Sequence, residues 1–222
     1  VLPAEGPANG AGEATPGGGF AQVRHTPGTP NARVMVIAPA EIVAERAGYD
    51  LLEQLSVLSG ERGAHHLLAE VAESSAEFET LRQLGFAIYA RQDIWRLTGP
   101  AAAPAPSRVA VRLREPADTF GIQTLYANIV PRLVQQVEPP PARRSRGYVH
   151  NVEGELLAYL DVARGPLGIL IQPYFHPAVR AVAGLLAGLL HQLPDRRERP
   201  LYVLVRSYQT WLGSPLAEIG FE

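Results

Sequence analysis

Short apolar runs recur along the chain and predict β-strands. In the run Phe20–His25, Ala21 and Val23 alternate with the polar residues Gln22 and Arg24, a pattern typical of a strand with one buried face. Other runs predict strands at residues 32–38, 66–71, 109–114, 156–162, 167–172 and 201–205. The run 87–97 alternates, which predicts a strand that closes the sheet of the first half of the chain. Because helical segments separate these runs, the chain is predicted to be an α/β protein.

The longer segments between the strands carry helical patterns. Residues 40–60 repeat leucine at spacings of three and four, which predicts a helix that ends at Gly63 or three residues earlier. Residues 178–193 are apolar almost all round, which predicts a buried helix. A third helix is predicted at residues 118–136, with Asp118 as its N-cap.

The same order of elements occurs twice. Each copy has two strands, a helix, another strand and a short helix before a Gly-Phe pair. Four pairs of landmarks keep an offset of 134 or 135 residues: Gly19 and Gly154, Pro39 and Pro173, Val71 and Val205, and Gly85 and Gly220. A constant offset over the whole chain predicts two copies of one structural module.

The repeat predicts the domain organisation. Residues 1–98 form the C-terminal part of the first module, and residues 1–19 at its start are a flexible loop rich in glycine. Residues 99–107, rich in proline and alanine, are a linker. Residues 108–222 form a second module that lacks its last strands. The simplest interpretation is a fragment of a longer chain; a permutation, or a strand exchanged between the copies, is the alternative.

Composition narrows the function. Of 222 residues, 46% are apolar and 19% are charged, which is sufficient for a packed core. The net charge of −2 predicts neither a nucleic-acid partner nor a membrane surface as partner. Cysteine and lysine are absent, which excludes disulfides, thiolate metal sites and Schiff-base chemistry. The longest apolar run, Ala181–Leu190, is about half the length of a bilayer span, and we expect a cytoplasmic protein.

Two segments carry a family resemblance. Residues 67–97 resemble the end of a GCN5-related N-acetyltransferase (GNAT) domain, where a strand, a short helix, a Leu-Gly-Phe turn and a final strand follow one another. Residues 111–131 resemble the opening strand and first helix of the same family. The whole chain therefore resembles a tandem GNAT protein, which implies the acyl-CoA N-acyltransferase fold, a mixed sheet, in two copies that are both incomplete.

The resemblance implies where the acyl donor binds. In the family, acetyl-CoA lies where two parallel neighbouring strands separate, and its pyrophosphate rests on backbone amides at the start of the long helix, a position that suits an anion. The corresponding gaps would separate residues 32–38 from 66–71, and 167–172 from 201–205. The residues implied for this role are Ile37, Ala38, Arg46, Ala47, Gly48, Gln172 and Arg180. No metal is implied.

Two motifs of the family are reduced in this chain. The glycine-rich phosphate loop corresponds to residues 43–48, where only Gly48 is retained, and the second copy has no such loop at residues 176–184. Glycine matters there because a Cβ atom would obstruct the approach of phosphate to the amides. The tyrosine that serves the family as general acid corresponds to Leu81 and Leu216.

Other side chains are candidates for the proton transfers. Glu70 and Glu73 flank the end of a strand and are the nearest candidates for a general base in the first copy. Tyr208 is a candidate acid in the second copy, although aromatic residues in such a position more often belong to the core. Arg46 and Arg180 stand near helix starts, where they either meet a phosphate or, as we favour, are solvated surface arginines.

The predicted function is an N-acetyltransferase that transfers an acyl group from acyl-CoA to a small-molecule or protein amine. The alternative is a catalytically silent GNAT-like module that binds an acyl-CoA or another ligand. A third hypothesis makes one copy purely structural, and the second copy, with its apolar helix and no phosphate loop, suits that role better. The pattern does not predict an acceptor or an oligomeric state.

Overall fold

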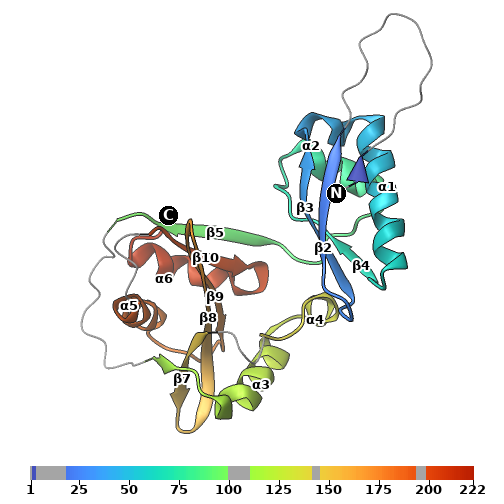
Figure 1. The fold of residues 1–222 in the computed structure, drawn as a ribbon. Coiled ribbons are helices and arrows are strands. Elements are labelled where there is room, and N and C mark those ends of the chain that lie inside the picture. Colours follow the sequence, from blue (N-terminus) through green and yellow to red (C-terminus); the bar gives the residue numbers. More distant parts are fainter. Residues whose placement is uncertain (1, 4–18, 100–110, 142–145, 194–198) are drawn as a thin grey trace, which may run out of the picture. The chain divides into compact units, whose positions relative to one another are not determined.

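The computed structural model describes residues 2–3, 19–99, 111–141, 146–193 and 199–222, and its chain divides into two compact units (Figure 1). The first unit is Val1–Ile88 and the second is Tyr89–Glu222. Most of the predicted flexible loop (1–19) and of the predicted linker (99–107), together with the start of the predicted strand 109–114, lies outside the described residues.

The first unit contains a four-stranded sheet in the order β1-β2-β3-β4. Its strands are β1 (Leu2–Pro3), β2 (Phe20–His25), β3 (Asn31–Ala38) and β4 (His66–Leu68). The pairs β1–β2 and β2–β3 are antiparallel, whereas β3 and β4 are parallel. Strand β4 is shorter than the predicted strand 66–71, because the residues after Leu68 leave the sheet.

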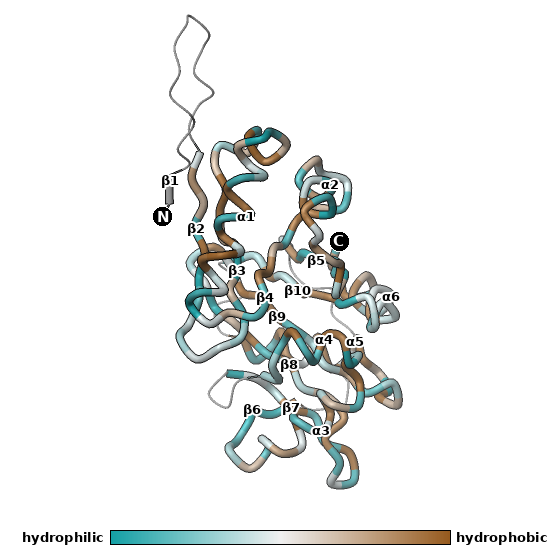
Figure 2. Tube along the Cα trace, turned by 90° about the vertical axis from the view of Figure 1, so that its right-hand side faces the viewer, coloured by the Kyte–Doolittle hydropathy of each residue, from teal (hydrophilic) through white to brown (hydrophobic). Residues whose placement is uncertain are grey.

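Two helices and a short 3₁₀ turn cover the first sheet. They are η1 (Ala40–Ala44), α1 (Arg46–Glu61) and α2 (Ala76–Gln83). The prediction of one helix over 40–60 was wrong at its start, since the extended backbone of Glu45 separates η1 from α1. Its end was predicted correctly: Gly63 has φ +86° and follows the helix, and Ala64 N–H donates to Ser59 O at 3.0 Å. Figure 2 shows apolar positions along α1.

The second unit contains a six-stranded sheet in the order β5-β10-β9-β8-β7-β6. Its strands are β5 (Gln92–Leu97), β6 (Arg112–Leu113), β7 (Gly147–Val152), β8 (Glu155–Gly165), β9 (Gly168–Phe175) and β10 (Leu201–Arg206). All pairs are antiparallel except β9–β10. Strand β7 was not predicted, and β9 runs three residues further than predicted, through Pro173 to Phe175.

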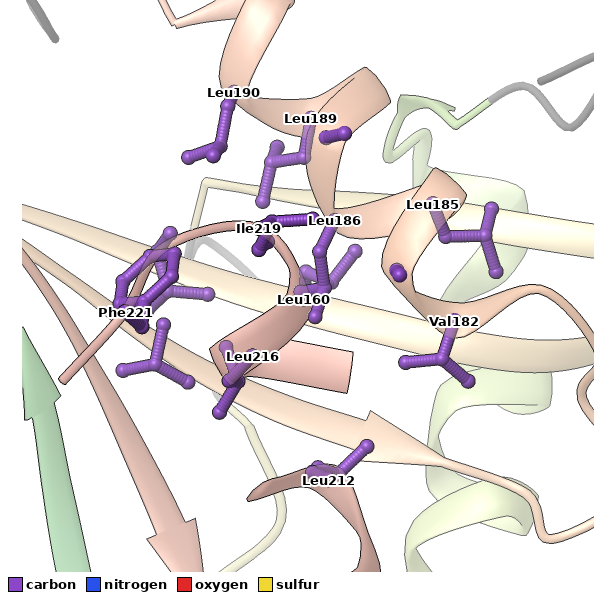
Figure 3. Close-up of a cluster of buried hydrophobic side chains, with 14 of the residues drawn as sticks. Leu160, Val182, Leu185, Leu186, Leu189, Leu190, Leu212, Leu216, Ile219 and Phe221 are labelled. Carbon is purple, nitrogen blue, oxygen red and sulfur yellow. The ribbon is translucent and has the colours of Figure 1, made fainter. Parts of the chain in front are cut away.

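Helices cover both faces of the second sheet. They are η2 (Pro116–Asp118), α3 (Thr119–Ile129), α4 (Arg132–Val137), α5 (Val182–Gln192), η3 (Ser207–Leu212) and α6 (Gly213–Glu218). Helices α5 and α6 pack on one face of the sheet, and Leu160, Leu185 and Phe221 belong to the core between these helices and the sheet (Figure 3). Helices α3 and α4 pack on the other face against Tyr159 and Tyr174. The sheet is therefore the middle of three layers.

The predicted helix 118–136 is two helices. Helix α3 ends before Val130, whose backbone is extended, and α4 begins after Pro131. Asp118 is not the side-chain cap of α3: its carboxylate accepts from the backbone of Glu115 and pairs with Arg112 at 2.6 and 2.7 Å. The Arg112 guanidinium lowers the pKa of Asp118 below its ordinary value.

The two units repeat one arrangement. Strands β2-β3-β4 and β8-β9-β10 share an order in which the first pair is antiparallel and the second is parallel. The Gly-Phe turns are also the same: Gly85 has φ +86° and Gly220 has φ +94°. In each turn the following phenylalanine donates its N–H at 3.0 Å to a leucine carbonyl, that of Leu81 or Leu216. Both units thus carry the module that the sequence repeat predicted.

Strand β5 differs from its prediction. The run 87–97 was expected to close the first sheet, but β5 belongs to the second unit, where it pairs antiparallel with β10 over six residues. On its other side, Arg96 exchanges two backbone hydrogen bonds with Glu222, at 2.7 and 2.9 Å. The strand that follows the first module therefore lies in the second sheet. This fits the alternative of a strand exchanged between the copies better than a closing strand of the first sheet.

Candidate functional site

Each unit contains a gap between two parallel strands. In the first, β3 and β4 pair from Asn31–His66 to Arg33–Leu68, after which β3 continues to Ala38 paired only with β2. In the second, β9 and β10 pair from Ile169–Leu201 to Ile171–Val203, and both strands then continue without pairing to each other. The prediction that these segments are parallel neighbours is confirmed in both units.

The start of α1 is a closed turn. Glu45 N–H donates to Ile42 O at 2.9 Å, and Gly48 N–H donates to Glu45 O at 3.1 Å. A Cβ atom on Gly48 would lie 2.1 Å from Ile42 O, so the glycine permits the turn to pack on the helix. Gly48 therefore has a local structural role, and the carboxylate of Glu45 stands at the positive end of the helix.

The other residues implied for donor binding lie around the two helix starts. Ile37 and Ala38 are half-buried at the end of β3, and Ala47 is half-buried in the first turn of α1. The Arg46 side chain is 91% exposed and pairs with Asp50 at 3.2 Å. In the second unit Gln172 is half-buried in β9, and Arg180 is exposed just before α5.

The loop before α5 has no phosphate-loop geometry. Its residues bond to one another: Val179 N–H donates to His176 O at 2.9 Å, and Ala178 N–H donates to His176 Nδ1 at 3.2 Å. Ala181, which precedes the helix, has φ +56° without being glycine. Val179 and Val182 are buried apolar residues at this helix start, so the side chains on either side of Arg180 and Ala181 belong to the core.

The candidate bases in the first unit are accessible. Glu70 follows β4 and lies 3.6 Å from the guanidinium of Arg33, with both side chains about half exposed. Glu73 is also exposed. The positions of the missing tyrosines are filled by core residues, since Leu81 is 6% exposed and Leu216 is 0% exposed. Their carbonyl groups anchor the Gly-Phe turns, and neither side chain can donate a proton.

Sequence reasoning missed a polar cluster beside the second gap. Arg206, at the end of β10, pairs with Glu138 at 2.5 Å, and Tyr89 O–H donates to the same carboxylate at 2.7 Å. Tyr126 O–H donates to the Glu138 carbonyl at 2.5 Å. The predicted candidate Tyr208 is half-buried against the same cluster. These residues are distant in sequence, and their types alone carried no signal of this contact.

Burial changes the acidity of the tyrosines in this cluster. It raises the pKa of Tyr126 and of Tyr208 to about 12, and the negative charge of Glu138 contributes in both cases. The pKa of Tyr174, which stacks on Tyr159, is raised further for the same reason. Tyr208 is therefore a very weak acid here, and the geometry supports a core role for it more than a catalytic one.

The second gap contains a side chain. Gln209, in η3, is 2% exposed and bonds to the backbone of β9 at Pro173 and Phe175. In the first unit, Arg33 on β3 pairs with Glu70, which follows β4. The two gaps are alike in strand topology, and in the second a buried carboxamide occupies the place of a strand partner.

Metal and membrane features are not found in the described part of the chain. No group of three or more histidine, cysteine, aspartate or glutamate residues there is placed to hold a metal ion. No helix of residues 19–99, 111–141, 146–193 or 199–222 has both the length and the apolar character needed to span a membrane.

Solved structures share this fold. A functionally unknown conserved protein from Staphylococcus epidermidis has a TM-score of 0.63 and 13% identity, over 91% of this chain and 86% of its own. A GCN5-related N-acetyltransferase from Sphaerobacter thermophilus has a TM-score of 0.55 and 13% identity, over 85% and 68%. A tandem GNAT protein from the clavulanic acid biosynthesis pathway has a TM-score of 0.52 and 19% identity, over 92% and 75%.

No protein-family model and no curated protein sequence matches the chain. The structural likeness, at identities below 20%, is a likeness of fold. The chain therefore has the GNAT acyl-CoA N-acyltransferase fold, a mixed α/β architecture with the duplicated module described above.

Proposed function

We propose that the chain is an acyl-CoA-dependent N-acyltransferase whose donor cleft is the gap of the first unit. The observation that supports this most is the separation of β3 from β4 next to the start of α1. Beyond Arg33, the edge of β3 that faces away from β2 offers backbone N–H and C=O groups to an extended ligand that bears amides, such as the pantetheine arm of CoA.

Exposure supports the first gap over the second. Met35 and Val36 on β3 are 38% and 44% exposed, and Val71, which follows β4, is 38% exposed. In the second unit, by contrast, Phe175 at the end of β9 and Val205 near the end of β10, which follow the last β9–β10 pair, are 0% and 1% exposed. A ligand therefore reaches the strand edge in the first unit without displacing core side chains.

The phosphate end of the donor would have fewer contacts than the family pattern offers. The turn before α1 uses its own carbonyls for the amides of Glu45 and Gly48, which leaves the first-turn amides of Arg46 and Ala47 to face an anion. The exposed Arg46 side chain can add a positive charge at this place. We therefore expect weak binding of the pyrophosphate, with most of the affinity from the strand edge.

The proposed chemistry needs one base and no metal. The amine nitrogen attacks the thioester carbonyl carbon, a C–N bond forms, and the C–S bond breaks to release the CoA thiolate. Glu70, with Glu73 as the second candidate, takes the proton of the amine, and the thiolate takes a proton from water because Leu81 supplies none. The acceptor is proposed only as an amine, from a small molecule or a protein.

The test is release of free CoA by the full chain in the presence of acetyl-CoA and a panel of amines. The chain has no cysteine, so a thiol reagent detects only the released CoA. Arg46→Glu, which reverses the charge at the proposed phosphate end, should raise the KM for acetyl-CoA. Arg62→Glu at the far end of the same helix is the matched control and should leave it unchanged. No release above the blank with any amine would contradict the proposal.

A second candidate is a catalytically silent module that binds an acyl-CoA. The burial of Leu81 and Leu216 at the positions of the general acid favours it. In that case CoA stabilises the chain, by about 2.7 kcal/mol at 100 times its dissociation constant, while no thiol is released from acetyl-CoA. Thermal unfolding with and without CoA therefore tests the binding that both candidates require, and the release of free CoA from acetyl-CoA separates them.

A further inference from the structure

Gln209 joins the two sides of the gap in the second unit. Its Nε2 donates to Pro173 O at 2.9 Å, and its Oε1 accepts from Phe175 N–H at 2.9 Å. The side chain belongs to η3, which follows β10 directly, and it is 2% exposed. One carboxamide thus satisfies two backbone groups of β9.

These two backbone groups lie on the edge of β9 that faces β10. Ile169 N–H donates to Pro200 O at 3.0 Å, so residue 169 points its polar groups toward β10. The N–H and C=O of alternate residues of a strand point to the same side, which places Pro173 and Phe175 on that edge as well. Pairing with β10 ends at Ile171, and Gln209 takes over from there.

The Gln209 amide copies the contacts of a missing strand residue. In a parallel pair, one residue donates to the carbonyl before its partner and accepts from the N–H after it. Gln209 makes this pair of bonds around Tyr174. Continuing the register of Ile171 with Val203 would put Arg206 opposite Tyr174, but Arg206 diverges and pairs with Gln92 of β5 on the other side.

The surrounding residues hold Gln209 in this position. Its own backbone is not helical, with φ −129° and ψ 29°, so it marks a kink inside η3. Leu212, at the end of η3, is 0% exposed, and Trp211 packs its ring edge-on to Phe175 with the ring centroids 6.4 Å apart. Pro173 has no N–H, so no other donor of this strand edge is left unpaired between Ile171 and Phe175.

We propose that Gln209 is the built-in occupant of the β9–β10 gap, and that the gap is a slot for an extended amide chain which this side chain keeps closed. An acyl-CoA arm entering the second unit would need the carbonyl of Pro173 and the N–H of Phe175, and both are already used. The second unit of the native chain therefore takes no acyl-CoA, whatever the first unit does. This inference concerns β9 alone and does not depend on the function proposed for the first unit.

The first experiment measures hydrogen exchange of the Phe175 amide by NMR in the full chain. Phe175 N–H should exchange slowly in the native chain because Gln209 Oε1 accepts its hydrogen bond, and Gln209→Ala should speed its exchange on the order of tenfold or more. Gln135→Ala is the matched control, because the Gln135 carboxamide also makes two hydrogen bonds to the backbone, both to carbonyls at the α3–α4 corner. Gln135→Ala should leave the exchange rate of Phe175 N–H unchanged. Unchanged exchange in Gln209→Ala would overturn the proposal.

The second experiment adds pantetheine, the amide-bearing arm of CoA without its phosphates. The native chain should show no saturable shift of the Phe175 and Leu204 amides, whereas Gln209→Ala should bind pantetheine and recover slow exchange at Phe175. Gln209→Met keeps the bulk and removes the hydrogen bonds, so it should exchange quickly and stay closed to pantetheine. Binding by the native chain at these amides, or no binding by Gln209→Ala, would overturn the proposal. If Gln209→Ala does not fold, the proposal is tested by the other two proteins: pantetheine binding by the native chain, or slow exchange of Phe175 N–H in Gln209→Met, would overturn it.

Discussion

Glu138 and Arg206 form an ion pair of 2.5 Å between the segment that follows α4 and the end of β10. Their side chains are only 16% and 11% exposed, and Tyr89 adds a hydrogen bond to the same carboxylate. The pair ties the layer of α3 and α4 to the strand that borders the second gap. The two residues are 68 positions apart in sequence, and no sequence motif of the chain predicted their pairing.

Removing one member of this pair should be costly. Arg206→Met leaves the Glu138 carboxylate largely buried without its counter-charge, and we expect a loss of about 3 kcal/mol in the free energy of unfolding. Arg33→Met is the control, since its partner Glu70 is exposed and such pairs contribute less than about 1 kcal/mol. Urea unfolding measures both, and equal losses would contradict the assignment.

The raised pKa values of Tyr126 and Tyr208 predict a loss of stability in base. In the unfolded chain tyrosine ionises near pH 10, and in the folded chain both groups ionise near 12. The unfolded state releases these protons first, so the stabilisation is complete below about pH 10 and declines from there to pH 12. We expect each of the two tyrosines to lower the free energy of unfolding by about 2 kcal/mol over this pH range.

Absorbance of the phenolate and urea unfolding at pH 8, 10 and 11 check this together. Tyr208→Phe should remove one late-titrating phenol and flatten the decline. A native chain whose tyrosines all ionise near pH 10 would contradict the burial described for the cluster.

Two glycines of α1 should respond oppositely to alanine. Gly48→Ala drives a Cβ atom to within 2.1 Å of Ile42 O, so the turn before the helix must open, at a cost of about 2 kcal/mol or more. Gly60→Ala meets nothing within 4 Å and should stabilise the helix by about 0.5–1 kcal/mol. Thermal unfolding of the two variants measures the contrast, and a neutral Gly48→Ala would mean that the turn is open.

Under the proposed function, Glu70→Gln should lower the turnover of acetyl-CoA on the order of a hundredfold, because the amide accepts no proton from the amine. The KM for acetyl-CoA should stay the same, since Glu70 is not proposed to touch the donor. Glu61→Gln, an exposed carboxylate at the end of α1, is the control. If Glu70→Gln retains full turnover and Glu73→Gln loses it, the second candidate is the base; if both retain it, neither is.

Much of the fold could be predicted because its determinants are local. The leucines of α1 and the apolar run of α5 follow helical spacing, and each Gly-Phe turn needs a glycine where φ is positive. The breaks at Glu45 and Val130 were missed: apolar helical spacing continues across Glu45, whereas at Val130 the following Pro131 was a local signal of the break. The residues proposed for the site were predicted from a resemblance, and their roles stay predictions.

The amino-acid sequence by itself determined the duplicated module, the order of its strands and helices, and the positions of its turns, because periodicity and backbone preference act within a few residues. Only the tertiary structure decided that β5 pairs with β10, that Arg206 meets Glu138, and that Gln209 fills the second gap. Strand edges offer the same N–H and C=O groups whatever their side chains, so their partners are selected by long-range packing rather than by local sequence.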